Sequence, residues 1–283
     1  MTLPEINGHV APGFEAVREA FLANFEHHGE VGAACALFAG GERVVDLWGG
    51  CADPESGRSW QQDSLQLVFS ATKAATVVCL LRLVERGEVD LDAPVATYWP
   101  EFAAAGKGDI TVRWLLSHRA GIPVIDATLT LEEVYAWDPV IKALEIQAPS
   151  WEPGTTHGYH ARTFGWAVGE VVRRVSGQPL GQFFAEEIAG PLGLDFFIGL
   201  PSSMESRCTR VLAPVADPEA GAEKPLLEIF GPETLLHRVL TGPSGLFGYD
   251  DMWNSRALHA AEIPSSNGIC DARSLARFYA ALI

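Results

Sequence analysis

The residues best suited to chemistry are Ser70 and Lys73, in the segment Phe69-Ser70-Ala71-Thr72-Lys73. If a helix begins near Ser70, positions i and i+3 share one face, and the hydroxyl and the amine come within hydrogen-bonding reach. A serine hydroxyl is a weak nucleophile unless a neighbouring group takes its proton. Lysine can take that proton only when it is neutral, and burial among apolar groups lowers its pKa. The spacing therefore predicts a serine nucleophile with a lysine general base.

The surroundings of this pair bear on a simpler alternative, in which Ser70 caps a helix and Lys73 is an ordinary residue of its first turn. SxxK alone is a weak motif. However, lysine is scarce in this chain, yet Lys73 lies in the apolar segment LVFSATKAATVVCLLRLVERG. A helix beginning there would also direct the positive end of its dipole towards a developing oxyanion. We therefore favour the catalytic interpretation.

Apolar spacing predicts the elements that must position this pair. Residues 32–49 contain two apolar runs separated by Gly40-Gly41, which predicts an antiparallel hairpin. Because two strands do not form a stable sheet alone, we expect further strands from elsewhere in the chain. The segment 67–87 is apolar on nearly all sides of a helix, so we expect it deep inside the protein. Residues 200–266 show no decisive periodicity. We expect helices over Pro12 to His28, within 67–87, over Thr111 to His118 with a cap at Thr111, over Thr163 to Ser176 and after a cap at Asp271.

The composition is ordinary for a globular protein and limits the partners. The chain has 283 residues and a formal net charge of −16, which argues against nucleic acid and anionic lipid as partners. No apolar run approaches the roughly 18 residues of a membrane span, and no signal peptide is evident, so we expect a cytoplasmic protein. The five cysteines are scattered and never form CxxC, which favours reduced, mostly buried thiols over disulfides or a metal site. No metal motif or phosphate-binding loop is present, so no cofactor is expected.

A longer pattern resembles a known family. FSATKAAT, followed by LLRLVERGEVDLDAPVATYWPEF and LLSHRAGIP, resembles the serine β-lactamase and penicillin-binding superfamily, in particular the branch of class C β-lactamases and family VIII carboxylesterases. The similarity runs from about residue 30 to the end of the chain. It implies an α/β (α+β) fold, an antiparallel sheet flanked by helices, in one unit over 1–283 that is mainly helical from about residue 70. It also implies an acyl-enzyme mechanism with Ser70 as nucleophile and Lys73 as its base.

The family's next motif, Tyr-x-Asn, is present in altered form. WEPGTTHGYHARTFGW places Tyr159 at the tyrosine, and the resemblance implies that this phenol exchanges protons with the lysine and the leaving group. The alternative is a core tyrosine whose hydroxyl bonds to backbone. Position 161 is alanine, which cannot hydrogen-bond the amide of a β-lactam as the family's asparagine does. This difference favours esters without excluding lactams.

Other motifs in the chain could indicate a different catalytic mechanism. His157 and His160 flank the tyrosine, but no acidic partner can be assigned to either, so we expect them to line the pocket or to bond the loop. His118 is expected to be a structural residue of a turn. Gly242-Pro243-Ser244-Gly245 resembles a nucleophile elbow, but Leu246 replaces the last glycine and no clear strand precedes it.

The family's third motif, Lys-Thr-Gly or an equivalent on a strand beside the site, is not found before Ile283. In the family, closing strands follow a helix such as the one at the end of this chain. We therefore expect residues 1–283 to be a fragment that lacks those strands. An unpaired edge on the 32–49 hairpin would then favour aggregation. The fragment would also lack one oxyanion donor, a deficit of about 10²–10³ in rate.

Three functions follow from these observations. The first is a carboxylesterase that acts on small or medium esters through a serine acyl-enzyme. The second is a β-lactamase or D-alanyl-D-alanine peptidase-like enzyme. The third, consistent with Ala161, is a catalytically inactive homologue that binds a ligand. All three give the protein a small-molecule partner, while the sequence leaves its oligomeric state undefined.

Overall fold

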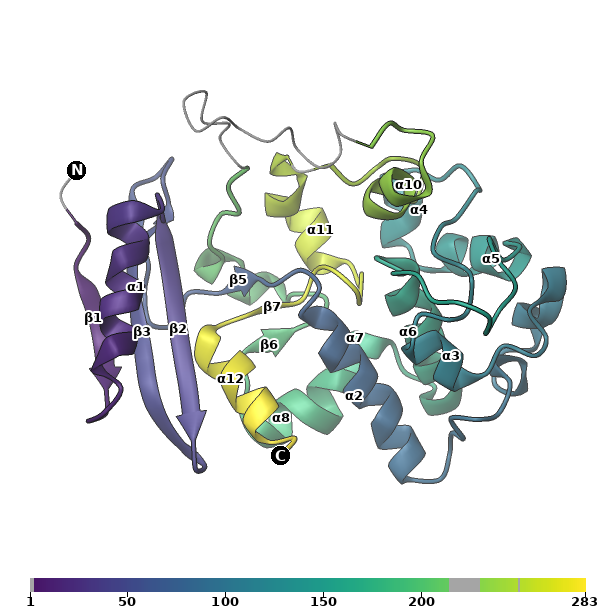
Figure 1. Cartoon of the computed structure of the whole chain (residues 1–283), viewed down its shortest axis with the longest axis horizontal. Coiled ribbons are helices and arrows are strands. Elements are labelled where there is room, and N and C mark those ends of the chain that lie inside the picture. The colour runs from purple at the N-terminus through teal and green to yellow at the C-terminus, as the bar shows by residue number, and fades with distance from the viewer. Residues whose placement is uncertain (1–2, 214–229, 249) are drawn as a thin grey trace.

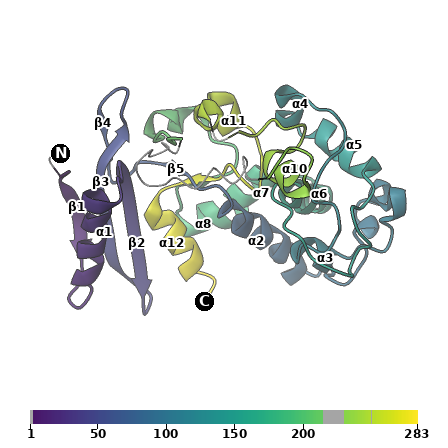
Figure 2. The ribbon, with the colours of Figure 1, turned by 45° about the horizontal axis from the view of Figure 1, so that its top comes forward.

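A small sheet lies at one end of the molecule and a group of helices at the other, with α2 (Thr72–Glu85) and α12 (Ala272–Ala280) between them (Figures 1 and 2). This arrangement comes from a computed structural model that describes residues 3–213, 230–248 and 250–283. Part of the 200–266 region, for which the sequence predicted no elements, lies outside the described residues. No helix in the described ranges is long and apolar enough to cross a membrane.

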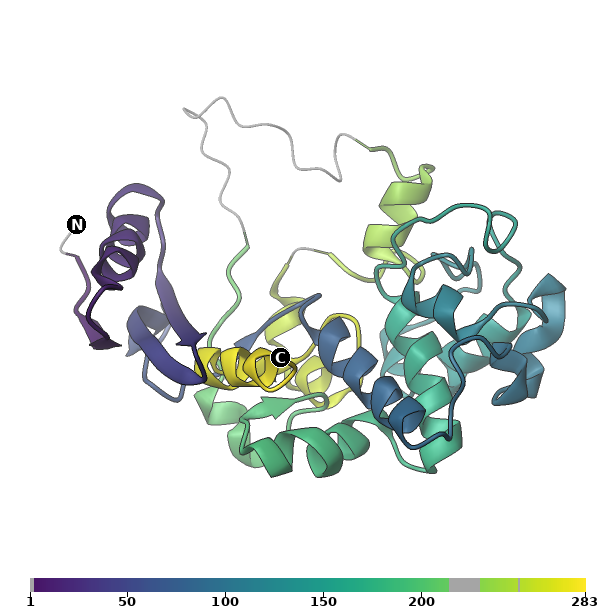
Figure 3. The same ribbon diagram turned by 60° about the horizontal axis from the view of Figure 1, so that its bottom comes forward.

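The N-terminal sheet contains the predicted hairpin. β2 (Gly32–Ala39) and β3 (Glu42–Asp53) are antiparallel, and Gly40 and Gly41 adopt the positive φ that their tight turn requires. The expected additional strands are β1 (Ile6–Val10) and the short β4 (Arg58–Ser59), both paired with β3. In the described residues β2 is paired on one side only, and α12 lies next to it (Figure 3).

Helix α1 (Glu15–His27), which the sequence predicted over Pro12 to His28, covers this sheet. Phe21 of the helix is buried against Val45 and Leu47 of β3, and Phe14 and Phe25 pack around them. This small core is separate from the main one. Burial of these apolar side chains therefore helps to hold the helix on the sheet.

A second sheet positions the start of α2. Its strands are β5 (Gln66–Leu67), β7 (Ile269–Cys270) and β6 (Phe196–Phe197), antiparallel in the order β5-β7-β6. Beyond the end of β5, the amide of Val68 donates to the carbonyl of Gly268 (2.8 Å). The sheet therefore brings together, just before α2, residues that are at least 200 positions apart in the sequence.

The remaining helices form the main core around α2 and α6 (Thr163–Ser176), which has the predicted bounds and ends at Gly177 in the left-handed region. Two predicted caps are also confirmed, since Thr111 accepts from the amide of Trp114 and Asp271 from that of Ser274. Within the described ranges, the other α-helices are α3 (Val112–Leu116), α4 (Leu131–Tyr135), α5 (Asp138–Ile146), α7 (Leu180–Phe184), α8 (Gly190–Leu192), α10 (Leu235–Thr241) and α11 (Arg256–Ala260). The 3₁₀ and π turns are η1 (Val95–Thr97), η2 (Pro100–Gly106), η3 (Ala185–Ala189), η4 (Ser202–Arg207) and η5 (Asp251–Asn254).

The expectation that α2 is buried on all sides is wrong. Leu81 is 42% exposed, and the valines of the helix are only half-buried. The buried face instead contains two threonines, and Thr76 donates to the carbonyl of Pro264 (2.6 Å) while Thr72 accepts from the amide of Gly268 (2.8 Å). Hydropathy missed this face because threonine hydroxyls can be buried at little cost when they are hydrogen-bonded.

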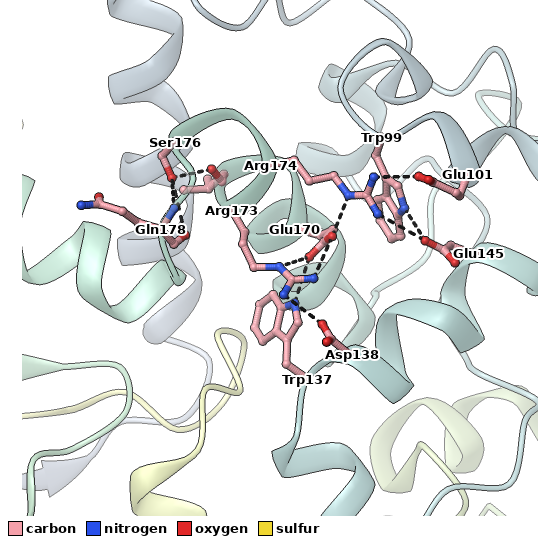
Figure 4. A network of polar contacts seen from close by, with 11 residues as sticks. Trp99, Glu101, Trp137, Asp138, Glu145, Glu170, Arg173, Arg174, Ser176 and Gln178 are labelled. Atoms are coloured by element: carbon pink, nitrogen blue, oxygen red, sulfur yellow. Dashed lines mark hydrogen bonds and ion pairs between the residues drawn. The ribbon is translucent and has the colours of Figure 1, made fainter.

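A buried carboxylate joins α6 to its neighbours (Figure 4). Glu170 is fully buried and accepts hydrogen bonds from the indole of Trp137 (2.9 Å) and from Arg173 and Arg174 (2.7 Å each). Arg174 also reaches Glu101 in η2 at 2.7 Å. A buried charge is tolerated only when it is paired in this way, so the network fixes α6, which begins just after the Tyr159 loop.

Candidate active site

Ser70 lies at a sharp turn between β5 and α2. The residue before it, Phe69, has φ 44°, a left-handed conformation that is unfavourable for a bulky side chain. The hydroxyl of Thr72 donates to the carbonyl of Phe69 (2.5 Å), and the Phe69 ring packs edge-on against Trp253 with centroids 4.9 Å apart. These contacts hold the turn and place Ser70 two residues before α2, close to the helix start that the sequence predicted.

Ser70, Lys73 and Tyr159 come together in the structure. The amine nitrogen of Lys73 lies 3.2 Å from Oγ of Ser70, and the phenolic oxygen of Tyr159 lies 2.7 Å from the same atom. The amine also lies 4.9 Å from the centre of the Tyr159 ring. The three residues chosen from the sequence are therefore in mutual contact, with the serine hydroxyl between an amine and a phenol.

The environment of Lys73 favours its neutral form. Burial lowers the pKa of Lys73 to about 7, with a smaller contribution from the positive charge of Arg162. Its amine donates to the carbonyls of Ala161 (2.7 Å) and Ser265 (3.0 Å). A lysine with such a pKa is partly neutral near pH 7, which is the condition for accepting the Ser70 proton.

Tyr159 is not the core tyrosine of the alternative interpretation. Its side chain is 45% exposed and its hydroxyl contacts Ser70. The loop that carries it is fixed by His160, whose Nε2 accepts from the amide of Ile122 (3.0 Å) and whose Nδ1 lies 2.6 Å from the carbonyl of Gly158. The expected loop hydrogen bond of His160 is therefore confirmed, while His157 is exposed.

His118 is a turn residue, as expected. Its φ is 58°, and its Nδ1 accepts from the amide of His160 (3.2 Å). Its ring lies 5.2 Å from that of Tyr159. Burial, and then the nearby charge of Lys73, lowers the pKa of His118 to about 4, so it is neutral at pH 7. His118 therefore supports the tyrosine loop without adding charge to the site.

A cavity of about 320 Å³ opens beside Ser70. Tyr159, Arg162, Asp250 and Ser266 contribute the polar groups of its lining. The rest of the wall is apolar and includes Phe69, Ala161, Val211, Leu212, Leu240 and Trp253. Such a wall suits an apolar group next to the reacting atoms.

Several residues of this site were not predicted from the sequence. Arg162 and Ser265 surround Lys73, and Trp253 forms part of the cavity wall. The adjacency of Arg162 to the tyrosine motif was a usable signal. Nothing in the sequence indicated that the turn Pro264-Ser265-Ser266-Asn267-Gly268 returns to α2, because that contact depends on the second sheet.

Two other groups of the described chain lie outside this arrangement. The hydroxyl of Ser244 bonds the backbone at Leu129 (2.8 Å), and its segment follows α10 rather than a strand, so it is not a nucleophile elbow. The five cysteines are free, as predicted, but only Cys79 and Cys270 are buried.

One trio of side chains has the composition of a metal site. Glu205, Cys208 and His259 place ligand atoms within 4.8 Å of one another. However, both ring nitrogens of His259 already lie 2.8 Å from an oxygen, of Glu205 or of the Trp253 carbonyl. Arg256 lies 3.2 Å from Glu205, so a metal ion would meet a guanidinium charge. The expectation of no metal cofactor stays a prediction.

The chain belongs to the β-lactamase family, whose model, described as Beta-lactamase, matches residues 17–282. It is 36% identical over 282 residues to Esterase/beta-lactamase LipL of Mycobacterium tuberculosis, and the match covers 97% of this chain and 64% of that protein. The chain thus spans 64% of the length of that relative.

Two solved structures share the fold. A family VIII carboxylesterase is 44% identical with a TM-score of 0.84, and a penicillin-binding protein homologue from Caulobacter crescentus is 38% identical with the same TM-score. Each match covers 98% of this chain and 71% of the other. The expected mixed α/β fold with antiparallel sheets and flanking helices is confirmed, and the family match begins earlier than the resemblance seen in the sequence.

Proposed function

We propose that the protein is a serine hydrolase that cleaves small or medium carboxylic esters through an acyl-enzyme on Ser70. The observation that carries this proposal is the contact of the Ser70 hydroxyl with both the Lys73 amine and the Tyr159 phenol. The family also supports it, because relatives and neighbours of this chain are named esterases.

In the first half-reaction, neutral Lys73 takes the proton of Ser70 while Oγ attacks the ester carbonyl carbon. The developing oxyanion lies near the start of α2, where the helix dipole is positive. The carbon–oxygen bond to the alcohol then breaks, and the proton passes to the leaving alkoxide from Lys73, directly or through Tyr159. The products of this step are the alcohol and a Ser70 ester.

In the second half-reaction, water attacks the Ser70 ester. Lys73, neutral again, accepts a proton of the water through the same contacts, and Oγ of Ser70 recovers a proton as the carboxylic acid leaves. The overall reaction adds one water to one ester and consumes no cofactor. The two halves use the same groups in opposite directions, as general acid–base catalysis requires.

The cavity and Ala161 support esters as the substrate class. A volume of about 320 Å³ is at the low end of the roughly 300–1,000 Å³ of ligand pockets, which suits a small or medium substrate. Ala161 packs with Val124 and Val239 in a small apolar cluster, so its side chain offers no hydrogen bond to an amide. Its carbonyl, not its side chain, contacts Lys73.

A β-lactamase or D-alanyl-D-alanine peptidase-like activity is the second candidate, because the name of the relative LipL includes beta-lactamase as well as esterase. Incubation with a p-nitrophenyl acyl ester and with a chromogenic cephalosporin separates the two. We expect faster turnover of the ester. Faster turnover of the cephalosporin would favour the second candidate instead.

The decisive experiment concerns the nucleophile itself. A fluorophosphonate probe should label the wild-type protein and not Ser70→Ala, and ester hydrolysis should be lost with the label. Hydrolysis that persists in S70A would end the assignment of Ser70. A wild-type protein that is neither labelled nor active would favour the inactive, ligand-binding homologue.

Two further expectations stay predictions. Cell fractionation tests the cytoplasmic location, and the coding sequence around residues 1–283 tests whether this chain is a fragment.

A further inference from the structure

The direction of the Lys73 lone pair is set by two carbonyl groups. A neutral amine has two N–H donors and one lone pair, whereas a carbonyl oxygen can only accept. The amine lies 2.7 Å from the carbonyl of Ala161 and 3.0 Å from that of Ser265, and its third contact is the hydroxyl of Ser70. When both carbonyls take an amine proton, the lone pair is left facing the Ser70 hydroxyl.

The side chain of Ser265 joins these two carbonyls. Its hydroxyl is fully buried, donates to the carbonyl of Arg162 (3.0 Å) and accepts from the amide of Gly165 (2.6 Å). Arg162 directly follows Ala161, so one hydroxyl ties the backbone beside the first carbonyl to the residue that supplies the second. The two carbonyls belong to segments about 100 residues apart, and no covalent connection fixes their spacing.

The turn that carries Ser265 is held against both helices of the site. A side chain at Gly165 would approach the backbone nitrogen and the hydroxyl of Ser265 to 2.5 Å, so only glycine allows α6 to lie this close. On the other side, Thr76, one turn beyond Lys73 on α2, donates to the carbonyl of Pro264 (2.6 Å). Ser265 is therefore placed from α2 and α6 together.

We propose that Ser265 is a positioning residue of the active site, whose buried hydroxyl fixes the carbonyls of Ala161 and Ser265 so that the lone pair of Lys73 points at Ser70. This inference rests on the proposed function. Ser265 does not line the cavity beside Ser70, and it acts through Lys73. Its loss should slow the proton transfer and leave substrate binding in the cavity largely unchanged.

The test compares Ser265→Ala with wild type, using p-nitrophenyl butyrate as substrate. General-base catalysis contributes about 10²–10⁴ in rate, so a misdirected base should lower kcat of S265A by at least about tenfold, with KM within about twofold. The rate of fluorophosphonate labelling should fall by a similar factor. Ser265→Cys keeps a weaker donor of similar size, and its kcat should lie between those of S265A and wild type.

Ser274→Ala is the matched control. Ser274 is also buried, and its hydroxyl accepts from the amide of Asp195 (2.9 Å), away from Lys73. Both alanine variants should lose thermal stability, but only S265A should lose kcat. A kcat of S265A equal to that of S274A would overturn the inference, because it would show that Ser265 is only structural.

The failure of the proposed function gives a different result. If ester hydrolysis survives in S70A, both the proposed function and the role of Ser265 fall. If hydrolysis is lost in S70A and unchanged in S265A, only the role of Ser265 falls. Should S265A prove too unstable to purify, the same comparison is made between S265C and S274A.

Discussion

The phenolic oxygen of Tyr159 lies 2.7 Å from Oγ of Ser70, closer than the Lys73 amine at 3.2 Å. A hydroxyl has one proton to donate and two lone pairs. If the Ser70 proton goes to the neutral amine, Tyr159 donates its own proton to Oγ. The phenol is then placed to give a proton towards the leaving group once Oγ has bonded to the acyl carbon.

Replacing Tyr159 with phenylalanine removes this donor and leaves the ring in place. We expect kcat of Tyr159→Phe to fall by about 10²–10³, because the variant loses a general acid–base group. KM and thermal stability should change little, since the hydroxyl makes no contact in the core. Tyr279→Phe is the control, because Tyr279 is equally exposed, at 45%, and lies on α12 away from Ser70. Equal kcat in Y159F and Y279F would remove Tyr159 from the mechanism.

The pH dependence of the reaction follows from Lys73. Its pKa is lowered to about 7, first by burial and then by the charge of Arg162. Because the base must be neutral, kcat/KM should rise with pH and level off above about 7, falling about tenfold per unit on the acid side. A profile that stays flat from pH 5 to 8 would contradict a lysine base.

Substitutions of Arg162 test the same lysine base in a second way. Arg162→Met removes a positive charge that disfavours the ammonium form of Lys73, so the pKa of Lys73 should rise. The acid limb of the kcat/KM profile, where activity falls with decreasing pH, should then move to higher pH. Activity at pH 6 should therefore drop more than activity at pH 9. Arg162→Lys keeps the charge and should keep the limb near its wild-type position. If the acid limb moves equally in both variants, the shift comes from lost packing and not from the lost charge.

The local parts of this site could be predicted from the sequence. Ser70 and Lys73 are close because they are three residues apart across the turn that begins α2, and the hairpin and the caps at Thr111 and Asp271 follow from equally local rules. Tyr159 was placed only through the family resemblance, since no spacing rule relates it to Ser70. The contacts that could be derived were therefore those between residues close together in the sequence.

The features that could not be predicted depend on contacts between segments far apart in the sequence. α2 appeared apolar on all sides, yet its buried face uses the hydroxyls of Thr72 and Thr76 against the turn at 264–268. β1 was missed because its five residues are mostly polar and exposed. Ser265 and Trp253 reach the site through the second sheet and the segment before it. The spacing of apolar residues indicates which face of a helix or strand is buried, but it does not indicate which segment packs against that face.

Ala161 should control the choice between esters and lactams. Ala161→Asn restores the side chain that the family uses towards the lactam amide. We expect the ratio of cephalosporin to ester turnover to rise by about tenfold, the discrimination that one added hydrogen bond of about 1.4 kcal/mol gives. Because Ala161 packs against Val124 and Val239, the larger polar side chain should also lower the free energy of unfolding by about 1–3 kcal/mol. An unchanged ratio in a folded variant would show that position 161 does not set the substrate class.

Lys107 lies in the main helical region, away from Ser70. Its side chain is fully buried, and its three donors reach the carbonyls of Ala104 (2.8 Å), Glu145 (2.9 Å) and Gln147 (2.6 Å). Lys107→Met leaves these carbonyls without their donor, so the free energy of unfolding should fall by about 3 kcal/mol or more. Lys142→Met, at an exposed position on α5, should change it by less than about 0.5 kcal/mol. Similar values in urea titrations of the two variants would show that water replaces the lysine at these carbonyls.

The same lysine should give the stability of the protein a pH dependence of known sign. Burial lowers the pKa of Lys107 from its ordinary 10.5 to about 8, against an opposing effect of the Glu145 carboxylate. Below pH 8 the amine is protonated in both the folded and the unfolded chain, so it contributes no slope. Between about pH 8 and 10.5 the unfolded chain holds the proton that the folded chain has lost, so the contribution of Lys107 to stability rises with pH. The difference in free energy of unfolding between wild type and K107M should therefore widen from pH 8 to 10. The free energy of unfolding of K142M should instead run parallel to that of wild type. A difference between wild type and K107M that narrows over this range would mean that Lys107 stays charged in the folded protein.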